Sequence, residues 1–399
     1  MTLRILWHSS TPWGTGSYSV LTKRTVPGIV RLGYEAVINS WYGLQGEPQK
    51  WRILPKGKPD AESVGIVTVL PSTGNNYGTD TMLAAYRASG SDVCISCMDV
   101  WVIPAEISSK LNFAPWLPLD HDPCPQPIIN SLRTAMYPMC MSQWGTQVLK
   151  DAGIDAHYVP CSADSDVFKP GDQKLAREKT GIPQDAFLVT MVAANKDEHD
   201  RKGFGEALDG FARFAEKHDN ARLYIHTLWS GAIDIHALVE RLGIIDRVIM
   251  PNVYAMVMGM YSNDDMCNIY NSSDVLLNPA KSEGFGLPIL EAQMCGVPVI
   301  ASDFSTTDEL LFAGWKIAGQ RHWSFGADSW RFMVYVDSVI DCLEAAYSES
   351  SNKKLKQQAR NGALDLDTDR TITEYWKPAL AEIEKRLEKR QKYTTEATV

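Results

Sequence analysis

The sequence lacks the long apolar stretches of a membrane-spanning protein. No apolar run in its 399 residues approaches the roughly 18 residues that a transmembrane helix needs. The opening residues, Met-Thr-Leu-Arg-Ile-Leu-Trp-His, become polar too soon for the apolar core of a signal peptide. We therefore expect a cytoplasmic protein, and peripheral association with a membrane surface stays open.

The sequence also lacks clustered cysteines and a net positive charge. The 8 cysteines are scattered through a long chain, unlike the dense disulfide framework of small secreted domains. Cys94 and Cys97 match half of a zinc site, but they sit in a mostly apolar run with no second pair at zinc spacing, so we expect two buried structural thiols. The formal net charge of −9 argues against a basic surface that coats nucleic acid.

What is present is the composition of a globular protein large enough for two domains. Apolar residues make up 45% and charged residues 22% of the chain, which is typical of folded globular proteins. A chain of this length exceeds one ordinary hydrophobic core, because domains usually hold roughly 100–200 residues.

Both halves show the pattern of a parallel sheet with helices. A strand is expected at residues 3–7, then a polar turn with glycines, a helix at 17–32 that Gly33 ends, and a second strand at 36–41. This order makes a βαβ unit, whose strands are parallel. Further strands are expected at residues 64–70, 92–99 and 114–119, and in the second half at 187–193, 221–227, 248–250, 275–277 and 297–300.

Turn-forming residues at positions 159–170 are expected to link two Rossmann-like α/β domains, residues 1–165 and 166–370. The final stretch, residues 371–391, is expected to be a helix rich in Glu, Lys and Arg. Pro378 would kink or divide this helix. Its apolar residues recur every three or four positions and predict one face that packs on the protein: Ile372, Trp376, Leu380, Ile383 and Leu387.

The segment between the last two expected strands carries the strongest functional signal. Pro288 suits a first helical turn because its φ angle is fixed and it has no N–H to leave unpaired. Gly284 and Gly286 would let backbone amides approach a ligand at that helix end, which suits a phosphate or sugar oxygens. Glu283 and Glu291, near the same end, would accept hydrogen bonds from pairs of hydroxyl groups.

This segment resembles the signature of the retaining glycosyltransferases of family 4, which have the GT-B fold. Their signature is Glu-Gly-Phe-Gly-Leu-Pro-x-x-Glu-Ala followed by Gly-x-Pro-Val-Ile, and residues 283–292 and 296–300 match it almost letter for letter. Residues 158–170 resemble the family's interdomain segment, with Ser162 where the family prefers glycine. The resemblance implies two Rossmann-like domains facing across a cleft, with a C-terminal helix crossing back to the first.

The resemblance also implies a donor site, mostly in the second domain. Glu291 would hold the ribose hydroxyls, and Lys202, in Arg201-Lys202-Gly203, would neutralise the departing diphosphate. The family's additional arginine falls at Asn195, so either Arg201 or Asn195 takes its place. The transferred sugar would be held by Glu283 and the backbone of the following residues, Gly284, Phe285, Gly286 and Leu287.

In the first domain the resemblance is looser. Gly14 and Gly16 fall where the family has its glycine-rich first loop, near the donor phosphates and the acceptor. His121 follows an expected strand and resembles the family's histidine that faces the transferred sugar. Asp120 and Asp122 flank it and also match the Asp-x-Asp metal clamp of the other large glycosyltransferase fold. A Glu-x7-Glu enzyme needs no divalent metal, so we expect none.

The expected reaction is transfer of a hexosyl group from a nucleoside diphosphate sugar, UDP favoured over GDP, to an acceptor hydroxyl with retention of configuration. No other cofactor is expected. A non-catalytic sugar-nucleotide-binding protein and a GT-B epimerase or phosphorylase stay as alternatives. An NAD-dependent oxidoreductase would want Gly-x-Gly-x-x-Gly, and Ser19 stands where its third glycine belongs.

The acceptor is left open by the sequence: a saccharide, a lipid, a small molecule or a modified DNA base. Residues 41–58 interleave aromatic and basic side chains, as a binding surface for sugars or anions would. The other interpretation of this segment is an exposed loop with packed tryptophans. Its members of interest are Trp41, Tyr42, Lys50, Trp51, Arg52, Lys56 and Lys58.

Overall fold

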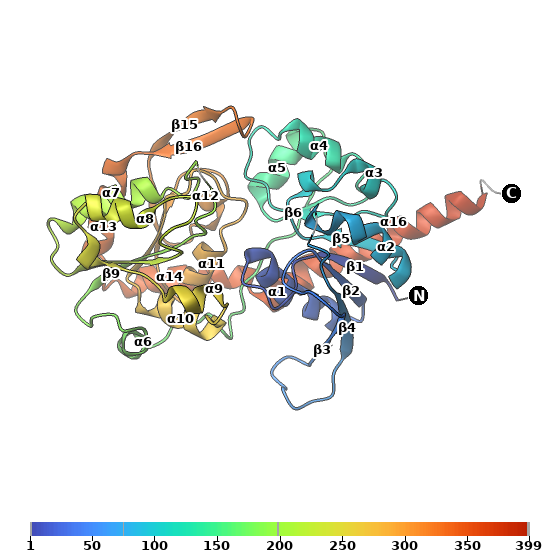
Figure 1. Cartoon of the computed structure of the whole chain (residues 1–399), viewed down its shortest axis with the longest axis horizontal. Helices are drawn as coiled ribbons and strands as arrows, with labels where there is room; N and C mark the ends of the chain where they lie inside the picture. The colour runs from blue at the N-terminus through green and yellow to red at the C-terminus, as the bar shows by residue number, and fades with distance from the viewer. Residues whose placement is uncertain (1, 75, 198, 397–399) are drawn as a thin grey trace. The chain divides into compact units, whose positions relative to one another are not determined.

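The computed structural model describes residues 2–74, 76–197 and 199–396, and the chain divides into two compact units. The first unit takes the chain up to Ser162 and again from Thr368 onward, and the second takes Ala163–Asp367. Each unit has its own sheet and its own helices; the first is blue to teal with a red terminal helix in Figure 1, and the second is green to orange.

The sheet of the first unit has the strand order β3-β4-β2-β1-β5 and is parallel except at its edge, where β3 runs antiparallel to β4. Five of the six β1 residues are buried, as expected for a central strand of a parallel sheet covered by helices. The strands are β1 (Arg4–Ser9), β2 (Glu35–Ser40), β3 (Gln49–Ile53), β4 (Gly65–Leu70) and β5 (Val93–Ser96).

A smaller parallel sheet, β6-β7-β8, continues beyond β5. Single bridges join Cys94 to Phe113 and Cys97 to Trp116. Both cysteines are completely buried, which confirms the prediction of two buried thiols. The short strands are β6 (Trp116–Leu117), β7 (Met139–Cys140) and β8 (His157–Tyr158).

Helices of the first unit follow its strands in the expected alternation. α1 lies between β1 and β2, and α2 lies between β4 and β5, where Met82 and Ala85 pack with Leu6 and Cys94 in the core. These helices are α1 (Ser17–Arg31), α2 (Thr79–Ser89), α3 (Ala105–Ser108), α4 (Gln126–Leu132) and α5 (Gln143–Asp151), with short 3₁₀ turns η1 (Asn76–Gly78) and η2 (Val100–Val102).

The end of the chain returns to the first unit as the sequence predicts. α15 (Thr368–Thr371), the π-helical turn η5 (Ile372–Trp376) and α16 (Lys377–Glu396) follow one another, and all five apolar residues of the predicted stripe are buried. Trp376 packs against Trp116 at 4.9 Å and Trp7 at 5.7 Å between ring centroids. Pro378 is the second residue of α16, a position where its missing N–H is tolerated.

The sheet of the second unit has the order β11-β10-β9-β12-β13-β14 and is entirely parallel. β10 lies on one side of β9 and β12 on the other, so the direction of winding reverses between β9 and β12. The strands are β9 (Phe187–Val192), β10 (Ala221–His226), β11 (Val248–Ile249), β12 (Val275–Asn278), β13 (Val299–Ser302) and β14 (Gly314–Ile317).

An antiparallel hairpin, β15 (Gly319–Ser324) and β16 (Ser329–Val334), follows this sheet and lies at the top of the second unit in Figure 1. The helices of the unit are α6 (Gln173–Thr180), α7 (Phe204–Ala215), α8 (Ile235–Arg241), α9 (Val253–Val257), α10 (Asn263–Ser272), α11 (Leu287–Met294), α12 (Thr306–Leu310), α13 (Val336–Ser348) and α14 (Lys353–Ala363), with 3₁₀ turns η3 (Ile245–Arg247) and η4 (Leu364–Leu366).

The two-sheet α/β architecture predicted from the sequence is confirmed. The predicted exposed loop at residues 41–58 is wrong in part, because residues 49–53 form β3 and pair along their whole length with β4. Within the described residues, no helix combines the length and the apolar character that crossing a membrane requires.

Candidate functional site

The predicted donor residues of the second unit gather at one edge of its sheet. The loop after β9 carries Arg201 and Lys202, and the loop after β12 carries Glu283. These strands are neighbours at the point where the strand order reverses. Loops that leave parallel strands on either side of such a point diverge and leave room for a ligand at the carboxyl edge.

Both positive side chains are directed at the carboxylate of Glu283. Lys202 Nζ lies 2.5 Å from Glu283 Oε1, and Arg201 Nη1 lies 3.8 Å from Oε2. The carboxylate is 9% exposed and the lysine 18% exposed. A carboxylate in such surroundings is stabilised only when it is paired. Asp197 Oδ2 also lies 3.6 Å from Arg201 Nε. The cluster therefore holds two cations and the buried Glu283 carboxylate at fixed positions beside the loops after β9 and β12.

The residues on either side of Arg201 and Lys202 fix the turn that carries them. Asp200 adopts a left-handed conformation with φ of 50° and accepts hydrogen bonds from the first N–H groups of α7, Phe204 N and Gly205 N, at 2.8 Å. Burial raises the pKa of the Asp200 carboxyl, and these two bonds oppose the rise. Gly203, with φ of 72°, is pressed against the loop after β12, where an added Cβ would lie 2.4 Å from the Pro279 carbonyl oxygen.

The loop that carries Glu283 is fixed by two hydroxyl groups from the segment after β13. Glu283 N donates to Ser305 Oγ at 3.1 Å, and Thr306 Oγ1 lies 3.0 Å from Glu283 O and 2.8 Å from Phe285 O. Ser305 itself has a φ of 60°, a conformation that residues other than glycine rarely adopt. Backbone strain of this kind is typical of functional sites.

The α11 helix begins where the sequence predicts. Gly286 precedes it with a φ of 103°, which a side chain would disfavour, and Pro288 occupies the first turn. Glu291 follows on the same helix and is buried; its Oε2 accepts a hydrogen bond from the Tyr270 hydroxyl at 2.8 Å. Tyr270, on α10, was not predicted as a site residue.

Asn195 has a different environment from the positive cluster. Its amide nitrogen donates to Ile233 O at 2.7 Å and to Leu228 O at 3.3 Å, and its oxygen accepts from Ile233 N at 2.9 Å. These bonds hold the loop before α8. Of the two candidates for the family's additional arginine, Arg201 is the one that faces Glu283.

In the first unit, Gly14 and Gly16 lie between β1 and α1, as predicted. Gly16 is the N-terminal residue that precedes α1 and has open space around its Cα, whereas an added Cβ on Gly14 would lie 2.3 Å from Ser19 Oγ. The Ser19 hydroxyl is buried without a hydrogen-bond partner among the described residues, and so is that of Thr11. These buried hydroxyls are suited to a polar ligand.

His121 lies four residues beyond β6 and is partly buried. Its Nδ1 lies 2.7 Å from Asp120 Oδ1, and such a bond favours the tautomer with its proton on Nδ1. Among the described residues, no three His, Cys, Asp or Glu side chains gather as they would around a metal ion.

The aromatic and basic side chains of residues 41–58 separate in the structure. Trp41 packs with Tyr18, Tyr42 and Tyr77 at the carboxyl end of β2, with centroid distances of 5.6–6.4 Å. The basic residues point elsewhere: Lys50 donates to Thr68, and Lys56 pairs with Asp369.

Tyr270, Ser305 and Thr306 were not predicted as site residues, because the sequence gives only a weak signal for them. Tyr270 lies on an ordinary helix 21 residues before Glu291, and only the fold brings the two together. Ser305 and Thr306 come three and four residues after β13, the strand in which the signature ends, so a search for hydroxyl groups after β13 would have found them.

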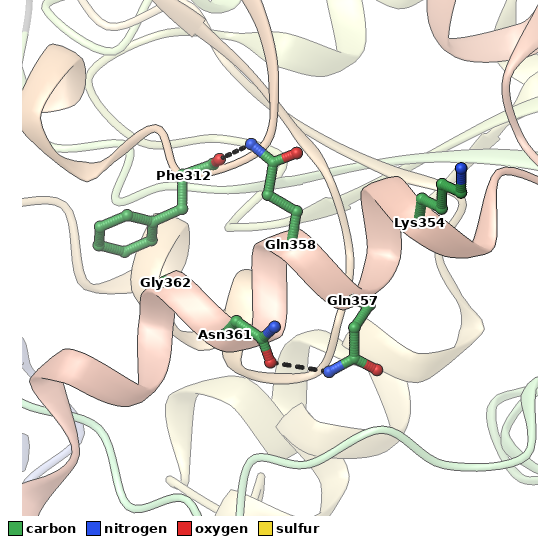
Figure 2. A pocket seen from close by; sticks show the side chains of 6 residues that line it. All are labelled: Phe312, Lys354, Gln357, Gln358, Asn361 and Gly362. Atoms are coloured by element: carbon green, nitrogen blue, oxygen red, sulfur yellow. Dashed lines mark hydrogen bonds between the residues drawn. The ribbon is translucent and has the colours of Figure 1, made fainter.

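A surface depression of about 440 Å³ also lies in the second unit, lined by Phe312 and residues of α14. Figure 2 shows Gln358 donating to the Phe312 carbonyl and Gln357 to Asn361. None of the predicted site residues lines it.

Comparison with known proteins supports the assignment of the second unit. Residues 172–314 match the family model described as Glycosyl transferases group 1. A D-inositol 3-phosphate glycosyltransferase from Mycolicibacterium smegmatis is 33% identical over 144 residues, 35% of this chain and 30% of that protein. One from Acidothermus cellulolyticus is 31% identical over 153 residues, 36% and 32%. The match thus spans about a third of these relatives' length.

Solved structures resemble the whole chain. A sucrose-phosphate synthase from Thermosynechococcus elongatus has a TM-score of 0.73 at 12% identity and covers 97% of this chain and 100% of its own. The Anabaena protein HepE in complex with UDP and glucose has a TM-score of 0.66 at 14% identity, with coverage of 95% and 100%. At this identity the likeness establishes the fold, which is GT-B.

Proposed function

From the match of residues 172–314 to the glycosyl transferases group 1 model, we propose that the chain is a retaining glycosyltransferase that uses a nucleoside diphosphate sugar. It transfers a hexosyl group to an acceptor hydroxyl. The observation that carries this proposal is the convergence of Arg201 and Lys202 on Glu283 at the reversal point of the second sheet.

The positive pair has the chemistry that a departing diphosphate requires. When the bond between the sugar and the diphosphate breaks, negative charge develops on the leaving oxygen. A compact ammonium and a guanidinium already held nearby stabilise this charge without reorganising in the reaction. Arg201 Nη1 also donates to Ser282 O at 2.8 Å, so its guanidinium is oriented before a donor arrives.

Glu283 has two roles in this proposal. It keeps Lys202 and Arg201 in place in the absence of donor, and its carboxylate accepts hydrogen bonds from sugar hydroxyls when the donor is bound. The first-turn N–H groups of α11 lie next to it in the chain and suit the oxygens of a sugar or a phosphate. The contacts from Ser305 and Thr306 fix this segment, so little conformational entropy is lost on binding.

Glu291 is proposed to accept hydrogen bonds from the ribose hydroxyls. The Tyr270 hydroxyl already holds one of its oxygens, which leaves the orientation of the carboxylate set for a vicinal diol. UDP is favoured as the nucleoside diphosphate. That HepE is solved with UDP and glucose agrees with this choice.

The first unit is proposed to hold the acceptor. Exposed aromatic rings at its sheet edge, Tyr42 at 56% and Tyr77 at 49%, suit stacking on a hydroxylated ring. His121 is proposed to contact the transferred sugar. Gly14 and Gly16 are proposed to allow close approach of the donor's diphosphate. A saccharide acceptor agrees best with this aromatic set.

A thermal-shift screen tests the proposal. UDP, GDP, their hexose conjugates and NAD are compared, each with and without excess chelator. Ligands that bind only the folded protein raise the midpoint, by the equivalent of about 2.7 kcal/mol at one hundred times the dissociation constant. We expect stabilisation by a nucleoside diphosphate sugar, undiminished by chelator. Stabilisation by NAD alone would instead favour an oxidoreductase.

A further inference from the structure

Two cysteine side chains of the second unit face each other across neighbouring helices. Cys267 lies on α10 and Cys295 directly follows α11, and their Sγ atoms are 3.8 Å apart. They are 28 residues apart in the sequence, and no spacing motif relates them. Cys267 is partly exposed, whereas Cys295 is buried.

The surroundings of Cys267 stabilise its thiolate. The Asn271 amide nitrogen lies 3.2 Å from Cys267 Sγ. A hydrogen bond with Cys295 lowers the pKa of the Cys267 thiol to about 6, although burial opposes the shift. Burial and the neighbouring sulfur raise the pKa of Cys295. Cys267 is therefore the nucleophile near neutral pH, and Cys295 lies beside it as a protonated thiol.

The other cysteines have no such environment. All six are buried, and burial raises the pKa of Cys342 to about 11 and that of Cys124 to about 12. Reactivity of a cysteine follows its thiolate fraction and its exposure. Cys267 is thus the one cysteine that is partly exposed, and its pKa is lowered rather than raised.

We propose that Cys267 and Cys295 are a thiol–disulfide exchange site whose oxidation weakens donor binding. The second half of the proposal rests on the proposed function of Glu291 in holding the nucleoside. The oxidant is a low-molecular-mass disulfide, the chemical class that undergoes exchange with protein thiolates.

The exchange is balanced in two steps. The Cys267 thiolate attacks one sulfur of the small disulfide, a mixed disulfide forms, and the second sulfur leaves as a thiolate. Cys295 then gives up its proton and attacks Cys267 Sγ, which releases the remaining small thiolate. The two cysteines lose two electrons, the small disulfide gains them, and the released thiolates take up protons as their pKa and the solution pH dictate.

Oxidation is expected to alter the donor site because α10 and α11, which carry the cysteine pair, also carry Tyr270 and Glu291. Tyr270 lies one turn after Cys267 on α10, and Glu291 lies one turn before Cys295 on α11. A disulfide requires a sulfur–sulfur distance of about 2.0 Å, so the 3.8 Å gap must close. This movement is made next to the hydrogen bond from Tyr270 to Glu291, and it shifts the carboxylate that receives the ribose.

The test compares reduced, oxidised and re-reduced full-length protein. Glutathione disulfide is the oxidant and dithiothreitol the reductant, and peptide mass spectrometry maps the cross-link. UDP affinity is then measured by calorimetry. We expect a Cys267–Cys295 cross-link and a dissociation constant about tenfold higher in the oxidised protein, as the loss of the hydrogen bond from Tyr270 to the Glu291 carboxylate would give. Dithiothreitol restores the original value.

Variants separate the two halves of the proposal. Cys267→Ser and Cys295→Ser should keep their UDP affinity after oxidant, and the matched variant Cys342→Ser should respond like the natural protein. Absence of the cross-link overturns the exchange site, and a cross-link without a change in UDP affinity overturns the control of donor binding. If the reduced protein does not bind UDP, the proposed nucleotide and its control both fall, while the cross-link still decides the exchange chemistry.

Discussion

Lys202 Nζ and Glu283 Oε1 lie 2.5 Å apart, although 81 residues separate them in the sequence. The two loops that meet here follow β9 and β12, which are neighbours in the sheet. A second link, from Lys281 N to Arg201 O at 2.8 Å, holds the loops together through their backbones. The ion pair is thus set by the backbone of two loops and not by the reach of a flexible lysine.

Gly203→Ala tests the backbone origin of this pair. An added Cβ would lie 2.4 Å from Pro279 O at a φ of 72°, so the two loops must separate. We expect destabilisation by about 1–3 kcal/mol and at least tenfold weaker nucleotide binding, measured by urea unfolding and calorimetry. Gly243→Ala is the control, because its φ is 68° but its surroundings are open. Equal effects of the two changes would contradict the role of the close approach.

Tyr270→Phe removes the hydroxyl that holds Glu291 and leaves the ring. The loss of one hydrogen bond to a charged group costs about 1.5–3 kcal/mol, part of which appears as weaker binding. We expect the dissociation constant of the nucleoside diphosphate to rise about tenfold, and the thermal midpoint to fall by a few degrees because the bond joins two buried groups. Tyr347→Phe, which loses a hydrogen bond to Asn220 elsewhere in the unit, should bind normally. An unchanged affinity in Tyr270→Phe would show that Glu291 needs no orientation.

Trp376→Ala tests the anchoring of the terminal helix. The ring is 1% exposed and packs against Trp7 and Trp116. Truncation of a buried tryptophan usually costs about 3–5 kcal/mol, so the midpoint of thermal unfolding should fall by many degrees. The exposed Trp101→Ala should leave it nearly unchanged. A small effect in Trp376→Ala would mean that the helix contributes little to the first unit.

The burial of His8 leads us to predict that the free energy of unfolding falls in acid. Burial lowers the pKa of His8 from 6.5 to about 4, and its ring nitrogens contact Asn39 and Tyr77 O. Above pH 6.5 both folded and unfolded forms are neutral; as the pH falls toward 4, the unfolded form takes up a proton first, and stability is lost. The loss reaches roughly 2 kcal/mol at pH 5.

The measurement is the fall in thermal midpoint between pH 7 and pH 5. This fall should be smaller in His8→Gln than in the natural protein, and the exposed His236→Gln should behave like the natural protein. An equal fall in His8→Gln would mean that His8 does not titrate on unfolding.

The sequence predicts the parts of this molecule that local patterns control. The β1–α1–β2 unit, the start of α11 after Gly286 and the buried stripe of the terminal helix all follow from apolar spacing, glycine and proline. The Glu-x7-Glu segment and the Arg201-Lys202 pair were found by resemblance. Each of these features lies within one short stretch of chain.

Features that depend on distant segments could not be predicted. Tyr270 gives no local sign that it will face Glu291, and Cys267 and Cys295 read as two unrelated cysteines. Asn195 was a candidate for the diphosphate because of its place after β9, but its amide bonds to Leu228 and Ile233 arise only when that loop folds. The hairpin β15–β16 was missed although Trp323 and Trp330 flank a turn with Gly326.

The central claim, that Lys202 and Glu283 form the diphosphate and sugar site, is tested most directly by calorimetric titration of UDP and GDP. The natural protein, Lys202→Ala and the exposed Lys354→Ala are compared at one ionic strength. We predict that one of the two nucleotides binds the natural protein and Lys354→Ala equally, and binds Lys202→Ala about 10- to 100-fold more weakly, since a charge-assisted contact is lost. Equal binding to all three proteins, or to none, would contradict it.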